Sequence, residues 1–217
     1  MTKLMIFDLD GTLLDTIRDL AEATNHVLAA HGYPTHSTEA YHYFVGNGVR
    51  TLISRSLPEQ ARTPERIEQF KEEQVAYYHE HMYDHTRPFP GMQQVLAALQ
   101  GRGIKLAVVS NKVDEAVQQM IRDFFPEIRF EHICGQRDGI PHKPDPTMVN
   151  LVIAEAGVSK AEVLYFGDSD VDMQTAHNAG VKGIGVLWGY RTKEELQSAG
   201  AYAVLDKVED LLDQPEK

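Results

Sequence analysis

The stretch Leu4-Met5-Ile6-Phe7-Asp8-Leu9-Asp10-Gly11-Thr12 decides the fold and locates the chemistry. Its first four residues are an apolar run typical of a buried strand. If the strand period continues, Asp8 and Asp10 point to one side, where they suit a nucleophile beside a general acid–base, provided that a cation offsets their repulsion. Gly11 lets the backbone turn sharply and brings its N–H groups close to a ligand. An ordinary strand followed by an Asx-turn has the same composition, so the rest of the chain must decide.

The charge composition restricts the kinds of molecule that the protein can bind. The 217 residues carry 21 Lys and Arg against 32 Asp and Glu, a formal charge of −11. This balance repels phosphate backbones and anionic lipid, and therefore argues against nucleic-acid and membrane-surface functions. A small phosphorylated metabolite is compatible with it, because one local cation can override the global field.

The cysteine content and the hydropathy of the chain indicate the cellular compartment to expect. Cys134 is the single cysteine, so the chain can form no internal disulfide and no cluster of thiolate ligands. No apolar run approaches the ~20 residues that span a bilayer. Because the first residues lead directly into a strand without a signal-peptide pattern, we expect a cytoplasmic protein.

Apolar strand-like runs alternate with helical patterns along most of the chain, which predicts a parallel, doubly wound α/β sheet. The expected strands are 3–7, 105–109, 129–134, 163–166, 182–187 and 201–205. The expected helices between and after them are 92–102, 114–124, 147–156, 170–179 and 208–212.

One stretch interrupts this alternation. Between Thr16 and Tyr83 only helical patterns occur, over 17–31, 38–44, 49–57 and 65–83. The turn Pro88-Phe89-Pro90-Gly91 marks the return to the α/β pattern. We therefore predict a core domain made of residues 1–15 and 84–217, with an all-helical domain of residues 16–83 inserted after the first strand.

Two basic or polar segments follow later strands. Ser110-Asn111-Lys112 follows the expected strand 105–109 and precedes the expected helix 114–124. These residues could form an anion cradle at the start of this helix, or one of them could simply cap it. Lys143 lies between His142 and the rigid Pro144-Asp145-Pro146, where it could present a fixed charge to a phosphoryl group or remain a solvated loop lysine. Ligands of open parallel sheets bind beyond the carboxyl ends of the strands, which favours the functional interpretation.

An acidic segment, Gly167-Asp168-Ser169-Asp170-Val171-Asp172, follows the strand 163–166. Carboxylate oxygens are hard ligands that suit Mg²⁺. If Asp8, Asp10, Asp168 and Asp172 share one crevice, they repel one another and any phosphate by several kcal/mol. Lys143 together with one divalent cation would offset that repulsion, so the set itself implies a metal.

These four segments, in this order, resemble the motifs of the haloacid dehalogenase superfamily, specifically its phosphatases with a helical cap. The resemblance implies a Rossmann-like parallel sheet core with an inserted all-helical cap domain, and catalysis through an aspartyl-phosphate. It implies Asp8 as nucleophile and Asp10 as general acid–base, with Ser110 and Lys143 also catalytic. It further implies Mg²⁺ held by Asp8, the Asp10 backbone carbonyl and Asp168, with Asp172 in support. Phosphoryl oxygens would be bound by Gly11, Thr12, Ser110, Asn111 and Lys143.

Within the superfamily the chain looks most similar to phosphoglycolate phosphatases. The two segments that carry this are Val45-Gly46-Asn47-Gly48-Val49-Arg50 and Trp188-Gly189-Tyr190-Arg191-Thr192. The resemblance implies that the cap closes over the core and that Arg50 binds a substrate carboxylate, although a surface arginine is equally compatible. The alternatives are another small phosphate (sugar phosphate, nucleotide or pyrophosphate), a phosphomutase, or a non-catalytic phosphate sensor. A sensor would not need both Asp8 and Asp10.

Overall fold

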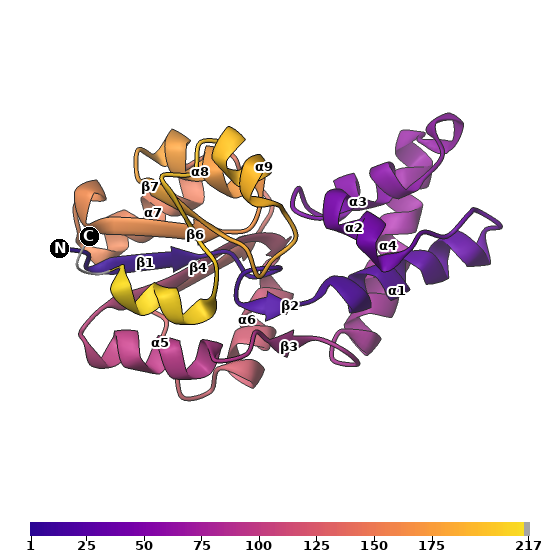
Figure 1. Cartoon of the computed structure of the whole chain (residues 1–217). Coiled ribbons are helices and arrows are strands. Elements are labelled where there is room, and N and C mark those ends of the chain that lie inside the picture. Colours follow the sequence, from indigo (N-terminus) through magenta and orange to yellow (C-terminus); the bar gives the residue numbers. More distant parts are fainter. Residues whose placement is uncertain (215–217) are drawn as a thin grey trace. The chain divides into compact units, whose positions relative to one another are not determined.

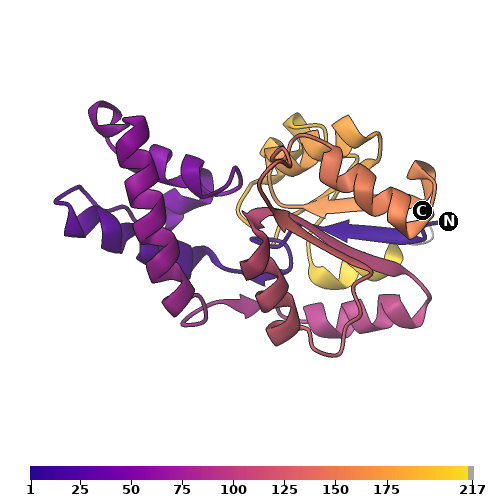
Figure 2. The ribbon, with the colours of Figure 1, turned by 180° about the vertical axis from the view of Figure 1, so that it is seen from behind.

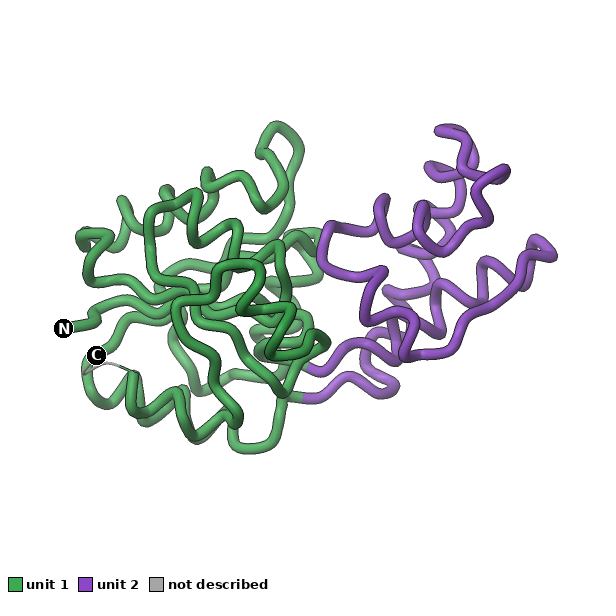
Figure 3. Tube along the Cα trace, turned by 45° about the horizontal axis from the view of Figure 1, so that its top comes forward, with its two compact units in different colours: residues 1–14, 88–217 green, residues 15–87 purple. Residues whose placement is uncertain are grey.

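The computed structural model describes residues 1–214, and the chain forms two compact units (Figure 3). The first consists of Met1–Leu14 and Pro88–Lys217, and the second of Asp15–Arg87. The observed division assigns Asp15 and residues 84–87 to the inserted unit, where the sequence had suggested the core. The two connections between the units run as the short strands β2 (Leu14–Asp15) and β3 (Arg87–Pro88), which pair with each other.

Within residues 1–214, six strands form the sheet of the first unit in the order β5-β4-β1-β6-β7-β8, and every neighbouring pair is parallel. The predicted α/β class with a parallel sheet is confirmed. The strands are β1 (Leu4–Phe7), β4 (Lys105–Val113), β5 (His132–Gln136), β6 (Val163–Gly167), β7 (Lys182–Val186) and β8 (Ala203–Leu205).

Strand β1 lies in the middle of this sheet because its four residues, LMIF, are apolar on both faces. Leu4 and Ile6 are fully buried in the cluster formed with α7 (Thr147–Ala156) and α8 (Asp170–Ala179). Phe7 faces the other way and stacks on Phe166 of β6, with ring centroids 5.0 Å apart. Figures 1 and 2 show α7 and α8 over one face of the sheet and α5 (Met92–Gly101) over the other.

The predicted strands and helices of the core are present, and two of them need correction. Strand β4 continues to Val113, so Ser110-Asn111-Lys112 lie in the last part of a strand rather than after it. The register with β5 shifts between Val109 and Val113, and the chain bends there before α6 (Asp114–Phe124) begins. The segment expected as a helix at 208–212 is a 3₁₀ helix, η3 (Val208–Asp213). The structure adds α9 (Lys193–Ser198) and the 3₁₀ turn η2 (Lys160–Glu162).

The inserted unit is helical, as predicted. It contains α1 (Ile17–Ala30), α2 (Thr38–Phe44), α3 (Val49–Ser56), the 3₁₀ turn η1 (Glu59–Ala61) and α4 (Pro64–His81). Helices α1, α3 and α4 share a core that includes Leu28, Ile53 and Phe70. At the start of α1, the buried carboxylate of Asp19 accepts hydrogen bonds from the backbone N–H and the hydroxyl of Thr86, which ties the two ends of the insertion together.

Across the part of the chain that the structure describes, no helix combines the length and the apolar character that membrane crossing requires.

Candidate active site

The candidate site is built in the first unit, where β1 ends. The backbone N–H of Asp8 donates to the carbonyl of Phe166 at 2.9 Å, which continues the pairing of β1 with β6 by one residue. The Asp8 residue is only 6% exposed. A carboxylate at this depth needs compensating charge, because burial disfavours ionisation.

After Asp8 the chain forms a tight turn over residues 9–14. The N–H groups of Thr12, Leu13 and Leu14 all donate to the carbonyl of Leu9, at 3.0–3.2 Å. Gly11 has φ +81°, and a Cβ there would lie 2.4 Å from Oδ2 of Asp168. Glycine is therefore required at this position, both for its conformation and for the close approach of the acidic segment.

Asp10 is held by a lysine from the next strand of the sheet. Its Oδ1 lies 3.1 Å from Nζ of Lys112, and both side chains are largely buried, at 13% and 7% exposed. Lys112 therefore places a positive charge beside the predicted general acid–base. The sequence had suggested Lys112 only as part of an anion cradle.

Asn111 connects β4 to the loop that carries Lys143. Its Nδ2 donates to the carbonyl of Lys143 at 3.1 Å, and its Oδ1 accepts from the N–H of Lys143 at 2.8 Å. Ser110, 2% exposed, lies beside it and accepts at Oγ from the N–H of Lys112. The amide of Asn111 thus fixes the backbone that aims the Lys143 side chain.

Lys143 is the positive centre of the site and is only 2% exposed. Its Nζ lies 2.7 Å from Oδ1 of Asp172, 3.0 Å from Oδ1 of Asp8 and 3.2 Å from the hydroxyl of Tyr165. Burial opposes the charge, but Asp172 and Asp8 outweigh it and raise the pKa of Lys143 well above its usual value. The ammonium stays charged at neutral pH: it donates hydrogen bonds to Asp172 and Tyr165 and forms an ion pair with Asp8.

Asp168 and Asp172 come from the end of β6 and the first turn of α8. Oδ2 of Asp168 accepts from the backbone N–H of Tyr190 at 2.9 Å. Oδ2 of Asp172 accepts from the hydroxyl and the N–H of Ser169, at 2.6 and 3.1 Å, in a reciprocal cap of α8. Both carboxylates are thereby held in one orientation.

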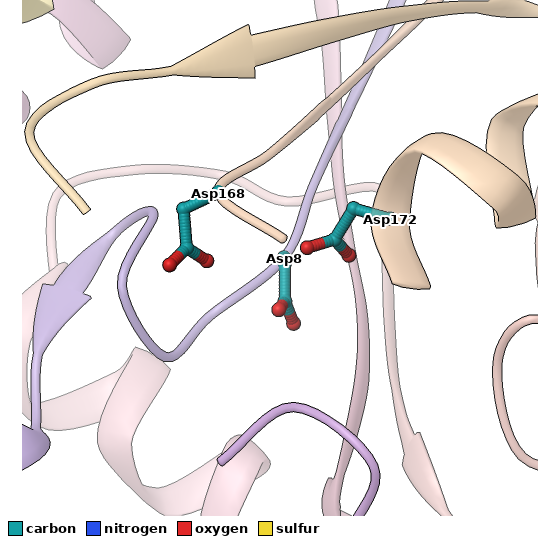
Figure 4. A group of neighbouring side chains, drawn as sticks. All are labelled: Asp8, Asp168 and Asp172. Atoms are coloured by element: carbon teal, nitrogen blue, oxygen red, sulfur yellow. The ribbon is translucent and has the colours of Figure 1, made fainter. Parts of the chain in front are cut away.

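The three carboxylates of Asp8, Asp168 and Asp172 converge (Figure 4), each offering an oxygen within 4.8 Å of the others. Burial raises the pKa of Asp8 to about 7, with Asp172 and Asp10 adding to the shift and Lys143 opposing it. Burial, Asp172 and Asp8 likewise raise the pKa of Asp168. Among the described residues, Oδ1 of Asp8 accepts no hydrogen bond. Crowded hard oxygens with an orphaned lone pair fit a divalent cation such as Mg²⁺.

The structure thus gathers most of the predicted site residues in one unit. They are Asp8, Asp10, Gly11, Thr12, Ser110, Asn111, Lys143, Asp168 and Asp172. Arg50 belongs to the inserted unit, at the start of α3, where it pairs with Glu68 at 2.8 Å and its side chain is 60% exposed. Its role toward substrate stays a prediction.

Sequence reasoning missed Tyr165. Its hydroxyl lies 3.1 Å from Oδ1 of Asp172 and, as noted, beside Lys143, and the residue is fully buried. In the sequence it is one residue of the apolar run 163–166 and looks like core. The available signal was its phenol, because a hydroxyl in a strand buried on both faces needs a polar partner.

Comparisons with known proteins agree with this arrangement. The sequence pattern of the haloacid dehalogenase-like hydrolases matches residues 5–186. A phosphoglycolate phosphatase of Mannheimia succiniciproducens is 32% identical over 97% of this chain and 96% of its own. Another, from Pseudomonas putida, is 31% identical over 98% of this chain and 79% of its own.

A crystal structure from Lactobacillus delbrueckii subsp. bulgaricus, of a protein named provisionally as a phosphoglycolate phosphatase, is 34% identical and matches with a TM-score of 0.93 over 99% of both chains. The similarity extends over nearly the whole chain and therefore over both units. The chain therefore belongs to the haloacid dehalogenase-like hydrolase family.

Proposed function

We propose that this protein hydrolyses phosphoglycolate, a small phosphomonoester, with Mg²⁺ as its cofactor and a phosphoryl ester on Asp8 as intermediate. The enzyme class, a phosphoric monoester hydrolase, rests on the family and on relatives with phosphatase activity in their names. The observation that carries the proposal is the Asp8 carboxylate, buried beside Lys143 at 3.0 Å and beside two further carboxylates. Such a group is desolvated, oriented and next to a fixed positive charge.

The chemistry proceeds in two displacements. A carboxylate oxygen of Asp8 attacks phosphorus, and the bond from phosphorus to the substrate's alkoxide oxygen breaks. Asp10 gives its proton to that leaving oxygen. A water molecule then attacks phosphorus and gives a proton to Asp10, the bond from phosphorus to the Asp8 oxygen breaks, and the Asp8 carboxylate is released together with inorganic phosphate.

The residues around Asp8 prepare it for this role. The pKa of about 7 in the metal-free protein means that Asp8 is only partly ionised near neutral pH. Bound Mg²⁺ would supply positive charge that favours the ionised nucleophile and neutralises the phosphoryl oxygens. Asp8, the backbone carbonyl of Asp10 and Asp168 would hold it. Asp172 would support it indirectly, since its oxygens already bind Lys143 and Ser169.

The remaining groups are proposed to bind substrate. Ser110, Lys143 and the turn containing Gly11 and Thr12 would hold the phosphoryl oxygens as their charge redistributes. Asn111 would contribute mainly by positioning Lys143, because its amide is engaged with that backbone. Arg50 is the proposed ligand of the substrate carboxylate.

A panel of small phosphates tests this function. We expect phosphoglycolate to rank first in kcat/KM among sugar phosphates, nucleotides and pyrophosphate, with activity lost on chelation and restored by Mg²⁺. Asp8→Asn is the matched control, since it preserves shape and removes the nucleophile. If another phosphate ranked first, phosphoglycolate would be the wrong substrate, but the protein would still be a phosphoric monoester hydrolase. A protein inert toward every phosphate, p-nitrophenyl phosphate included, would indicate a sensor.

A further inference from the structure

The loop after β7, Trp188-Gly189-Tyr190, lies directly against the Asp8–Thr12 segment. The indole N–H of Trp188 donates to the carbonyl of Thr12 at 2.9 Å. The backbone N–H of Tyr190 donates to Oδ2 of Asp168 at 2.9 Å. One short loop therefore holds both the turn that carries Asp10 and a carboxylate of the proposed metal site.

At Gly189 the backbone of this loop lies in close contact with Gly11 and Asp168. A Cβ at Gly189 would lie 2.4 Å from the carbonyl oxygen of Gly11 and 2.3 Å from Cβ of Asp168. Only glycine fits between them. The contact is therefore a packed junction of three segments, to which the indole of Trp188 adds a side-chain hydrogen bond.

The turn is held by its own hydrogen bonds and by contacts with other segments. Three of its N–H groups donate to the carbonyl of Leu9, and the Asp10 carboxylate pairs with Lys112. The Thr12 carbonyl adds a contact with the loop after β7, because it accepts the indole N–H of Trp188. Because Asp10 precedes this carbonyl by two residues in a closed turn, a rotation of the turn moves the Asp10 carboxyl.

We propose that Trp188 is a positioning residue, whose hydrogen bond to Thr12 orients the turn so that Asp10 reaches the leaving oxygen of the substrate. This role rests on the proposed function. It predicts a defect specific to the first displacement, because in that step Asp10 is needed only where the leaving group requires a proton. An alkyl phosphate leaves as a basic alkoxide and needs the acid, whereas p-nitrophenyl phosphate leaves as a stable phenolate and does not.

The test compares Trp188→Phe with wild type on these two kinds of substrate. We expect kcat/KM, which reports the first displacement, to fall about 10- to 100-fold for the best alkyl phosphate of the panel and less than about 3-fold for p-nitrophenyl phosphate. Leu187→Val, one residue before this loop, is the control: the backbone N–H of Leu187 donates to the carbonyl of Leu205, and the variant should behave as wild type on both substrates. An equal loss on both by Trp188→Phe would refute the positioning role, whereas an inert wild type would refute the proposed function itself.

A second measurement needs no variant. Trp188 is the only tryptophan of the chain, so the wild-type protein gives one indole N–H signal by NMR. If the indole holds the turn, its N–H should exchange with D₂O at least about 10-fold more slowly than a free indole. Immediate exchange in the folded protein would refute the proposal even if Trp188→Phe failed to fold.

Discussion

Replacing Asp8 by asparagine should abolish activity and, in the absence of metal, stabilise the fold. The asparagine keeps the shape of the side chain but removes a charge that burial, Asp172 and Asp10 all disfavour. Nucleophiles are commonly kept at such a thermodynamic disadvantage. The two effects of the substitution should therefore have opposite signs.

The magnitude follows from the pKa of Asp8, which rises from 3.8 to about 7 on folding. This rise in the pKa of Asp8 corresponds to a free-energy difference of about 4 kcal/mol between the two protonation states. Because the folded-state pKa is the higher one, the wild type has its full stability below pH 3.8 and loses it as the pH rises through 7. Between pH 5 and pH 8 the wild type should lose about 2–3 kcal/mol that Asp8→Asn does not lose.

The assay is denaturant unfolding of both proteins at pH 5 and pH 8 in the presence of a chelator. The advantage of Asp8→Asn should be larger at pH 8 by about 2–3 kcal/mol, or about 4–12 °C in Tm. Saturating Mg²⁺ should stabilise the wild type more than the variant, because the variant lacks one carboxylate ligand. An advantage that is equal at the two pH values, or larger at pH 5, would refute the assignment of Asp8 as a destabilised buried carboxylate.

Three further substitutions test individual contacts. Tyr165→Phe removes the hydroxyl beside Lys143, and it should lower kcat about 5- to 10-fold and stability by about 1 kcal/mol; unchanged kcat would show that the phenol does not orient the lysine. Lys112→Met leaves Asp10 without its buried cation, and steady-state kinetics should show kcat/KM reduced by about 10-fold or more; wild-type kinetics would contradict a role for the pair. Asp19→Ala removes the acceptor of the Thr86 hydrogen bonds and should lower the free energy of unfolding by about 2–3 kcal/mol, a loss that an unchanged denaturation midpoint would exclude.

Most of the site could be predicted because parallel strands end at one edge of the sheet. Asp8 follows β1 and Asp168 follows β6, and these strands are neighbours, so their carboxylates meet. The helical insertion was visible as a loss of the strand period. The extent of β4 was not predictable: Ser110-Asn111-Lys112 are polar and look like a loop, yet they remain in the strand, which pairs again with β5 at Val113 after a shift in register.

What the sequence could not give depends on contacts between distant segments. The pairing of Lys112 with Asp10 joins residues 102 positions apart. The hydrogen bond of Trp188 to Thr12 spans 176 positions. Neither follows from local pattern, because each depends on how segments far apart in the sequence pack against one another. For Arg50, the resemblance implies a bond to a substrate carboxylate. In the structure its side chain pairs with Glu68 of the same unit.

The proposed mechanism requires that a phosphoryl group is bound covalently to Asp8 during turnover. Acid quenching during turnover, followed by borohydride reduction and peptide mass spectrometry, identifies an acyl phosphate by its conversion to homoserine. We predict homoserine at position 8 in the wild type, in the presence of Mg²⁺ and substrate, and none in Asp8→Asn. Turnover with no conversion at Asp8, or with conversion at another carboxylate, would contradict the mechanism.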